Sequence, residues 1–272
     1  MLTWLLGDDQ PSVQYRTLVE LLGRSPTDPE VRAAKARIAT VGWVPEILSE
    51  RAPGGWWVGP KSYYTPKYLA TNWKLIVLSD LGVTRALIRF GYADDRRVRR
   101  TLDWLVASAD PKGGWSCWGS GRNLDSWEGL SALAAYPRAR RSAAMERAIE
   151  RGAEFFLERE LHRQGERYAP WYRFHYPVHY YYDLLVGLEL LTSLGYGSDP
   201  RLRYALEVLR RRRRADGRWN LDAVHPDVEG PPAAFYRTHP SQRPIPWSLE
   251  APGQPSKIVT LTALKVLDRV GA

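Results

Sequence analysis

Two carboxylates three residues apart, Asp125 and Glu128, precede or open a predicted apolar helix and could supply an acid. A carboxyl group in an apolar pocket has a raised pKa and can donate a proton to a substrate. Nearby aromatic rings could then stabilise a carbocation by cation–π attraction. The same spacing also fits a helix cap in which Asp125 caps the helix and Glu128 completes the arrangement. Both interpretations stay open, and Asp125 and Glu128 are the candidate catalytic residues.

A metal site is the second chemistry that the sequence offers. His175, His179 and Asp183 follow one another at intervals of four residues. On a continuous helix they would share a face, and three such ligands with a water form a catalytic Zn²⁺ site. However, Pro177 interrupts the helix, and the outer two positions would be about 12 Å apart along its axis. The pattern favours hydrogen-bonded histidines in a polar lining. No cofactor is indicated, and dependence on Mg²⁺ or Zn²⁺ stays open.

Anion binding is the third chemistry. Lys67, Arg173 and Lys257 could hold a diphosphate or a carboxylate near the N-termini of predicted helices. Ion pairs with acidic side chains of the same region account for them equally well, namely Asp125, Glu128 and Asp183.

Residues 168–183, YAPWYRFHYPVHYYYD, are unusually aromatic, since eight of the sixteen are Tyr, Trp or Phe. Tyr and Trp combine an apolar body with a polar tip and suit cavities and interfaces. We expect this segment to face the interior of the fold or its mouth. The residues expected to contact a ligand there are Tyr64, Lys67, Tyr68, Asn72, Trp127, Trp171, Tyr172, Arg173, His175, His179, Tyr180, Asp183 and Lys257.

Helical periods dominate the elements that must position these residues. Segments 95–108 and 142–161 each carry one apolar stripe, which is typical of outer helices. Segments 74–82, 130–136, 184–194 and 257–267 are apolar nearly all round, which predicts helices buried on all sides. The alternation predicts an all-α fold, an α/α toroid, as a single domain over 1–272. We further expect an N-terminal helical hairpin over 11–50. We also expect a long Pro-rich loop over 220–255 that wraps the ring and could cover one mouth of it.

Four turns place an aromatic residue after glycine, at Gly54-Gly55-Trp56-Trp57, Gly113-Gly114-Trp115, Gly165-Glu166-Arg167-Tyr168 and Gly217-Arg218-Trp219. The leading glycines of the last three are 52 residues apart, and Gly54 stands 59 residues before Gly113. Glycine tolerates the left-handed backbone of a helix end. We expect the tryptophans to pack between adjacent hairpins as structural residues.

This Gly–Trp turn, recurring near every 50 residues between inner and outer helices, resembles the prenyltransferase and squalene-cyclase repeat. Residues 112–137, KGGWSCWGSGRNLDSWEGLSALAAYP, carry the resemblance best, and it extends over roughly 50–272. It implies a terpenoid-cyclase-like toroid with a central cavity and a hydrophobic, isoprenoid-like ligand. The D-x-D-D motif of class II cyclases and the D-D-x-x-D motif of class I synthases are absent, as is a matching D-x-C of a zinc prenyltransferase. The resemblance therefore transfers no catalytic residue.

The net charge and the cysteine content limit which partners and which cellular compartment we expect for the protein. The formal net charge is +9, but no specific nucleic-acid motif accompanies it, and we interpret it as a solvated Arg-rich surface. Peripheral membrane contact stays open, and the oligomeric state is not indicated. The single cysteine, Cys117, excludes an intrachain disulfide and is expected to be a packing residue. With neither a signal peptide nor a membrane-spanning run, we expect a cytoplasmic protein.

The sequence thus favours a terpene-cyclase- or prenyltransferase-like protein that binds a hydrophobic or anionic small molecule in an aromatic central cavity, with acid-initiated cyclisation as its activity. Two alternatives stay open. One is non-catalytic small-molecule binding, or an interaction role, on the same toroid. The other is a sugar-active lyase or hydrolase, because toroids also bind sugars on Trp and Tyr platforms and could carry a paired acid and base.

Overall fold

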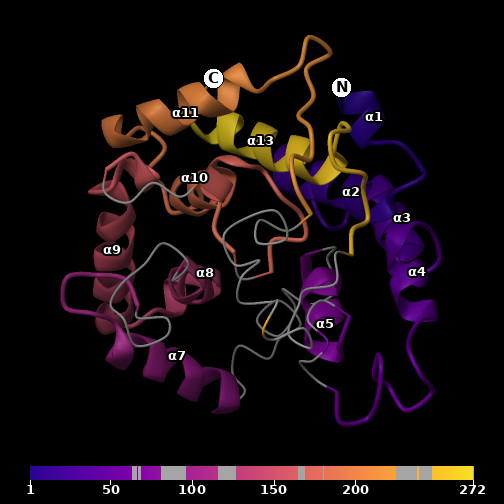
Figure 1. Cartoon of the computed structure of the whole chain (residues 1–272), viewed down its shortest axis with the longest axis horizontal. Coiled ribbons are helices and arrows are strands. Elements are labelled where there is room, and N and C mark those ends of the chain that lie inside the picture. Colours follow the sequence, from indigo (N-terminus) through magenta and orange to yellow (C-terminus); the bar gives the residue numbers. More distant parts are fainter. Residues whose placement is uncertain are drawn as a thin grey trace. The chain divides into compact units, whose positions relative to one another are not determined.

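The computed structural model describes residues 1–62, 66, 69–80, 96–115, 127–164, 169–179, 181–224, 238 and 247–271 (Figure 1). Every regular element in these ranges is a helix, apart from two isolated β-bridges, His175–Ala223 and Asn220–Pro255. Among the helices of these ranges, none combines the length and the apolar character needed to cross a bilayer. The predicted all-α class is confirmed for the described residues.

The helices fall into α-helices and short turns. The α-helices are α1 (Leu2–Leu5), α2 (Pro11–Arg16), α3 (Pro29–Arg37), α4 (Trp43–Ser49), α5 (Thr71–Asp80), α7 (Arg96–Ser108), α8 (Trp127–Ala135), α9 (Ala143–Leu157), α10 (Leu184–Ser193), α11 (Arg203–Arg211) and α13 (Lys257–Arg269). A π-helical turn, η1 (Thr17–Leu21), continues α2. The 3-10 turns are η4 (Arg138–Arg140), η5 (Glu160–His162), η6 (Ala169–Tyr172) and η7 (Pro200–Leu202).

The helices predicted to be inner correspond to α5, α8, α10 and α13. Those predicted to be outer correspond to α7 and α9. On α9 the expected stripe of Met145, Ile149, Gly152 and Phe156 is buried, as the 3.6-residue period requires. On α10 the leucines are buried nearly all round. The expectation is wrong for α5, where Leu75 is 43 % exposed, and for α8, where Leu130 and Leu133 are buried but Ala135 is exposed.

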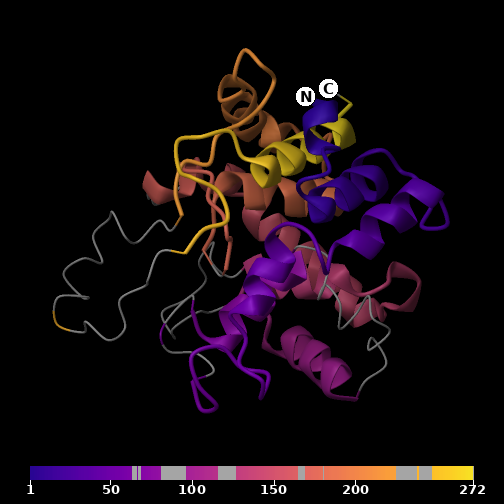
Figure 2. The ribbon, with the colours of Figure 1, turned by 90° about the vertical axis from the view of Figure 1, so that its right-hand side faces the viewer.

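The described chain divides into two compact units. Unit 1 comprises Met1–Thr84, Phe174–His179 and Arg213–Lys265, and unit 2 comprises Arg85–Arg173, Tyr180–Arg212 and Val266–Ala272. In unit 1, α2 packs on α3, side by side in both views (Figures 1 and 2), and α4 packs on α5. In unit 2, α7, α8 and α9 pack on one another, and α10 packs on α11. The single toroidal domain stays a prediction.

The glycine turns share one backbone pattern in the three copies that the structure describes, residues 52–57, 110–115 and 214–219. In each, the first N–H donates to the carbonyl four residues on, and the fourth N–H donates back to the first carbonyl, at 2.8–3.0 Å. The fourth position is Gly55, Gly113 or Gly217, each with φ between 82° and 89°. Gly55, and not the predicted Gly54, is therefore the counterpart of Gly113 and Gly217. The turn at Gly165 lies outside the described residues.

The tryptophan that ends each turn ties it to neighbouring helices. Trp57 Nε1 donates to the carbonyl of Ile47 at 2.8 Å, and Trp115 Nε1 donates to that of Leu105 at 3.0 Å, in both cases ten residues earlier. The backbone N–H groups of Trp57 and Trp219 donate to threonine hydroxyls on the following helix, Thr71 on α5 at 3.1 Å and Thr260 on α13 at 3.0 Å. Since all three indoles are also buried, they are structural, as predicted.

The Pro-rich loop is described at its two ends, and residues 225–237 and 239–246 lie outside the described ranges. Leu221 N donates to the Gln254 carbonyl at 2.9 Å, and Gly253 N donates to the Leu221 carbonyl at 2.7 Å. The loop therefore starts and ends at one hydrogen-bonded base. The Glu250 carboxylate, near the end of the loop, accepts from the Lys257 N–H at 2.6 Å and so joins the loop to the N-terminus of α13. The role of the loop as a lid stays a prediction.

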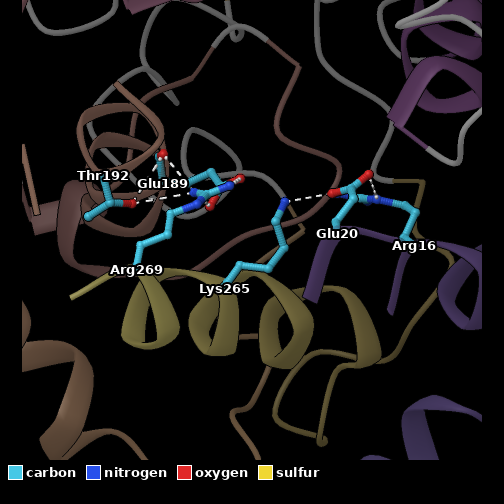
Figure 3. A network of polar contacts seen from close by, with 6 residues as sticks. All are labelled: Arg16, Glu20, Glu189, Thr192, Lys265 and Arg269. Carbon is cyan, nitrogen blue, oxygen red and sulfur yellow. Dashed lines mark hydrogen bonds and ion pairs between the residues drawn. The ribbon is translucent and has the colours of Figure 1, made fainter. Parts of the chain in front are cut away.

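Helix α13 contributes a charged side chain to each unit, a buried lysine to unit 1 and an exposed arginine to unit 2 (Figure 3). In unit 1, Lys265 Nζ donates to Glu20 at 2.7 Å, and Glu20 also accepts from Arg16 at 3.2 Å. In unit 2, Arg269 Nη1 donates to Glu189 of α10 at 2.7 Å. Lys265 and Glu20 are largely shielded from water and are paired, which is the condition under which buried ions are tolerated.

Candidate functional site

The predicted site residues fall into three groups. Tyr64, Lys67, Tyr68, Asp125 and Tyr180 lie outside the described residues, as does the side chain of Asn72 on α5. Trp127, Glu128, Trp171, Tyr172, Arg173 and Asp183 belong to unit 2, and His175, His179 and Lys257 belong to unit 1. Each unit holds one cluster of buried polar and aromatic side chains.

In unit 2 the aromatic segment packs around a residue that the sequence did not single out, His162. The rings of Trp171, Tyr172 and Tyr182 lie edge-on to the imidazole, with centroid distances of 5.7, 4.3 and 6.2 Å. Phe156 of α9 stacks on Tyr182 at 5.8 Å. His162 is only 1 % exposed, whereas Trp171 and Tyr172 are half-buried. These residues, with His162 at the centre, are called the His162 cluster below.

An unusual backbone places His162 in this cluster. Glu160, Leu161 and His162 have φ values of 44°, 63° and 134°, which residues with a Cβ rarely adopt. Each such residue costs about 1–3 kcal/mol, and the conformation persists only where its surroundings enforce it. Fully buried Leu161 anchors the turn, because its carbonyl accepts from Tyr182 Oη at 3.1 Å. The predicted helix over 142–161 is therefore wrong at its end, since α9 stops at Leu157.

The protonation of His162 follows from its contacts. Nδ1 is in contact with the carbonyl oxygen of Leu161, which can only accept, and we therefore assign the ring proton to Nδ1. Burial lowers the pKa of His162, against the opposing effects of the Leu161 carbonyl and the charge of Asp183. The ring is therefore neutral at pH 7, and Nε2 carries a lone pair. Nε2 is buried and has no hydrogen-bond partner within the described residues.

Two acidic residues of unit 2 are Asp183, a predicted ligand contact, and Glu128, a predicted catalytic acid. Asp183 is 1 % exposed, and its carboxylate accepts from Val186 N at 2.8 Å as the N-cap of α10. Its described contact is thus that of a helix cap. Glu128 lies in the first turn of α8 and is exposed, and Trp127 beside it is half-buried. An exposed carboxyl lacks the apolar pocket that the predicted acid catalysis requires. Arg173 is half-buried.

The cluster in unit 1 centres on Lys74 of α5. Lys74 is a second residue that was not predicted from the sequence. Its side chain is 1 % exposed, and Nζ lies 2.7 Å from Oε2 of Glu50, whose own side chain is 51 % exposed. Nζ also lies 3.7 Å from the centroid of the Trp247 ring. Burial lowers the pKa of Lys74, and the ion pair with Glu50 opposes this shift.

The two predicted histidines of this unit form part of the same surroundings. His179 is 5 % exposed and meets the edge of Trp73 at a centroid distance of 5.3 Å. Burial lowers the pKa of His179 to about 3, and the charges of His175 and Lys74 add to the shift. His175 is also buried, and its Nε2 lies 3.4 Å from the Val178 carbonyl. Within the described ranges, no three His, Cys, Asp or Glu residues are grouped so that they could hold a metal ion.

The predicted anion ligand Lys257 is committed to an ion pair. Its Nζ donates to both carboxylate oxygens of Asp9, at 2.6 and 2.8 Å. The partner is none of the acids that the sequence suggested, because the N-terminal segment that carries Asp9 folds against the start of α13. The described contacts of Lys257 are therefore internal.

Sequence signals for the missed residues differ in strength. Lys74 opens the apolar run KLIVLSDLG, and a lysine in a helix expected to be buried is itself a sign of a special site. Glu50 lies 24 residues away and carries no such sign. His162 was hidden because no glycine or asparagine marks the left-handed turn, so the helical period of α9 seemed to continue through it.

Comparison with known proteins found no matching family model, no matching curated protein and no matching solved structure. The function of the chain is therefore argued from the geometry of its own residues.

Proposed function

We propose that the chain binds an apolar, isoprenoid-type ligand that carries one hydrogen-bond donor, such as an isoprenoid alcohol, at the His162 cluster. The observation that supports this is the neutral imidazole whose Nε2 lone pair is buried among aromatic rings without a hydrogen-bond partner in the described part of the chain. A buried acceptor left unpaired costs about 1–3 kcal/mol, so a ligand donor that pairs with it gains affinity. The rings supply the apolar contact area.

The proposed architecture is the terpenoid-cyclase-like α/α toroid that the sequence resembles. Its support is the turn that recurs at 52–57, 110–115 and 214–219 with the same backbone hydrogen bonds and a buried tryptophan at the end. The correspondence of the predicted inner and outer segments with α-helices supports it as well.

The surroundings of the two described acids, Glu128 and Asp183, support binding rather than catalysis. Acid-initiated cyclisation needs a protonated carboxyl beside the ligand. Glu128 is exposed, Asp183 caps α10, and Asp125 lies outside the described residues. Asp125 is therefore the acid on which a cyclase activity would depend.

The binding test compares farnesol with farnesene, a hydrocarbon of similar shape without the hydroxyl, by titration calorimetry. We expect farnesol to bind roughly tenfold more tightly, which corresponds to about 1.4 kcal/mol for one satisfied acceptor. His162→Phe keeps an aromatic ring and removes the acceptor, so it should abolish the preference for the alcohol. Trp171→Ala and Tyr172→Ala should weaken the binding of both compounds.

Trp104→Ala is the matched control, because Trp104 is 63 % exposed on α7. Equal affinity of the wild type for the two compounds, or an unchanged preference in His162→Phe, would contradict the proposal. Catalysis is tested separately by incubating the protein with squalene and prenyl diphosphates, with and without Mg²⁺ or Zn²⁺, and analysing extracts by mass spectrometry. A cyclic product that is lost in Asp125→Ala would establish a cyclase.

A further inference from the structure

Unit 1 contains a second site, formed by Lys74, Glu50, Trp73, Trp247 and His179, that the proposed function does not use. We propose that Lys74 is a reactive amine that binds an apolar aldehyde covalently as an imine, with the body of the aldehyde against Trp247. The site is fixed by regular structure, since α4 and α5 are tied together through Trp57, which bonds to Ile47 of α4 and Thr71 of α5.

The hydrogen bonding of the amine distinguishes Lys74 from the other buried lysines described above. Lys265 and Lys257 donate well-directed hydrogen bonds to Glu20 and Asp9. The Nζ of Lys74 lies 2.7 Å from the Glu50 carboxylate but makes no well-directed hydrogen bond within the described residues. An ammonium has three N–H donors, and leaving them unsatisfied in the interior is costly. The missing hydrogen bonds thus work against the ammonium form of Lys74, whereas the Trp247 ring, 3.7 Å from Nζ, favours it by cation–π attraction.

The charges around Lys74 act in both directions. Glu50 from α4 stabilises the ammonium form, whereas burial disfavours it, and the net effect is a lowered pKa. His179, on the segment 174–179, is neutral at pH 7 because burial lowers its pKa to about 3. Deprotonated amines are nucleophiles, and desolvated lysines of this kind form Schiff bases with carbonyl compounds.

Access to the amine is possible through its carboxylate partner. Glu50 follows the last residue of α4, and its side chain is 51 % exposed, so we expect a change of its rotamer after proton transfer to open a path to a lysine that is itself 1 % exposed. Trp247 is half-buried and offers an aromatic face 3.7 Å from Nζ. An aldehyde with a flat apolar body matches this face, and a small polar aldehyde does not.

The chemical step is a condensation without a change of oxidation state. The Lys74 ammonium first transfers a proton to Glu50, and the nitrogen lone pair then forms a C–N bond to the carbonyl carbon. One N–H proton passes to the carbonyl oxygen, which gives a neutral carbinolamine. Glu50 returns its proton to the hydroxyl, which leaves as water while the nitrogen forms the C=N double bond. The ammonium and the aldehyde are thereby converted into a protonated imine and water, and Glu50 is again a carboxylate.

The test is reductive trapping on the full chain. The protein is incubated with cinnamaldehyde and sodium cyanoborohydride, and adducts are located by intact mass and peptide mapping. We expect one dominant adduct on Lys74, formed at least tenfold faster than on exposed lysines such as Lys35. Glycolaldehyde, which has no apolar body, should lose this selectivity. Labelling of Lys74 should also persist to lower pH than labelling of Lys35, because the lowered pKa keeps its amine neutral.

Two variants complete the design. Lys74→Arg should remove the dominant adduct, and Lys35→Arg should leave it in place. Adducts spread over the exposed lysines of the wild type, or an unlabelled Lys74, would overturn the proposal and identify Lys74 as a structural ion-pair residue. The wild-type map gives this answer even if Lys74→Arg does not fold.

Discussion

Glu20 shows how a single buried charge depends on its partners. Burial opposes its ionisation, but the positive charges of Arg16 and Lys265 and their hydrogen bonds outweigh this and hold its pKa well below its usual range. The Lys265 side chain is 2 % exposed and that of Glu20 is 13 % exposed, so the pair is largely shielded from water. Removing one member of such a pair leaves an uncompensated charge, which costs far more than losing a surface pair.

We predict that Glu20→Gln lowers the free energy of unfolding by about 3–5 kcal/mol at pH 7, measured by urea denaturation. Because the folded pKa is depressed, the stabilisation by Glu20 is present above the unfolded pKa of about 4.3 and is lost as the pH falls further. The difference between wild type and variant should therefore shrink at pH 3. Glu30→Gln is the control, since Glu30 pairs with Arg24 at the surface and should change stability by less than about 1 kcal/mol.

Residue types with a strong environmental preference were partly predictable from sequence. The tryptophans after the turn glycines were expected to be structural, and their burial and hydrogen bonds agree. Polar residues were harder, because pairing partners such as Asp9 for Lys257 or Glu50 for Lys74 are distant in sequence and carry no local signal. His175 and His179 are buried, with His179 against the edge of Trp73, whereas their predicted role in a hydrogen-bonded polar lining stays a prediction.

At the scale of the elements, the position of Asp183 at the start of helix α10 defines its role. As N-cap of α10 it accepts from Val186 N, and its charge also opposes the lowered pKa of His162. We predict that Asp183→Asn preserves stability, because Asn caps helices about as well as Asp, whereas Asp183→Ala costs about 1 kcal/mol in chemical denaturation. Neither substitution should change the affinity for farnesol by more than about twofold. A large loss of affinity in Asp183→Asn at unchanged stability would return Asp183 to the ligand site.

The turn before each buried tryptophan requires glycine at its fourth position. Gly113 has a φ of 83°, and a Cβ there would lie 2.0 Å from the carbonyl oxygen of Arg151 on α9. We predict that Gly113→Ala costs more than about 3 kcal/mol, because the backbone of α9 cannot give way as a side chain would. Gly195→Ala is the matched control: its φ is 97° and nothing lies within 4 Å of the added Cβ. It should cost about 1–2 kcal/mol, the cost of the left-handed conformation alone. Equal losses in urea denaturation would show that the close approach to Arg151 does not matter.

Periodicity predicted the elements better than it predicted their ends. The apolar patterns located α7, α9, α10 and α13 to within a few residues, because burial of one face or of all faces leaves a regular trace. The end of α9 was missed since Glu160, Leu161 and His162 adopt left-handed φ values without a glycine. Tertiary contacts, such as the hydrogen bond from Tyr182 to the Leu161 carbonyl, enforce that turn, and a local pattern does not contain them. The centre of the proposed ligand site was missed for the same reason.

At the scale of the whole molecule, the two units are interleaved along the chain. Residues 174–179 of unit 1 lie between segments of unit 2, and the chain passes between the units again after residues 212 and 265. Helix α13 continues without interruption through the last of these boundaries, between residues 265 and 266. Its buried residues Leu261 and Ala263 belong to unit 1, and Val266 and Leu267 belong to unit 2. Neither unit is therefore a continuous piece of chain that could be separated by one cut.

We predict from this connectivity that the chain unfolds in one cooperative transition. Loss of either unit would break the hydrogen-bond ladder of α13 and release the ends of segment 174–179, so the other unit should lose its order at the same denaturant concentration. Urea transitions followed by far-UV circular dichroism and by tryptophan fluorescence should coincide. Glu20→Gln in unit 1 and Gly113→Ala in unit 2 should each move the whole transition to lower urea. Two separate steps, with Glu20→Gln shifting only one of them, would instead show that a continuous α13 does not couple the units.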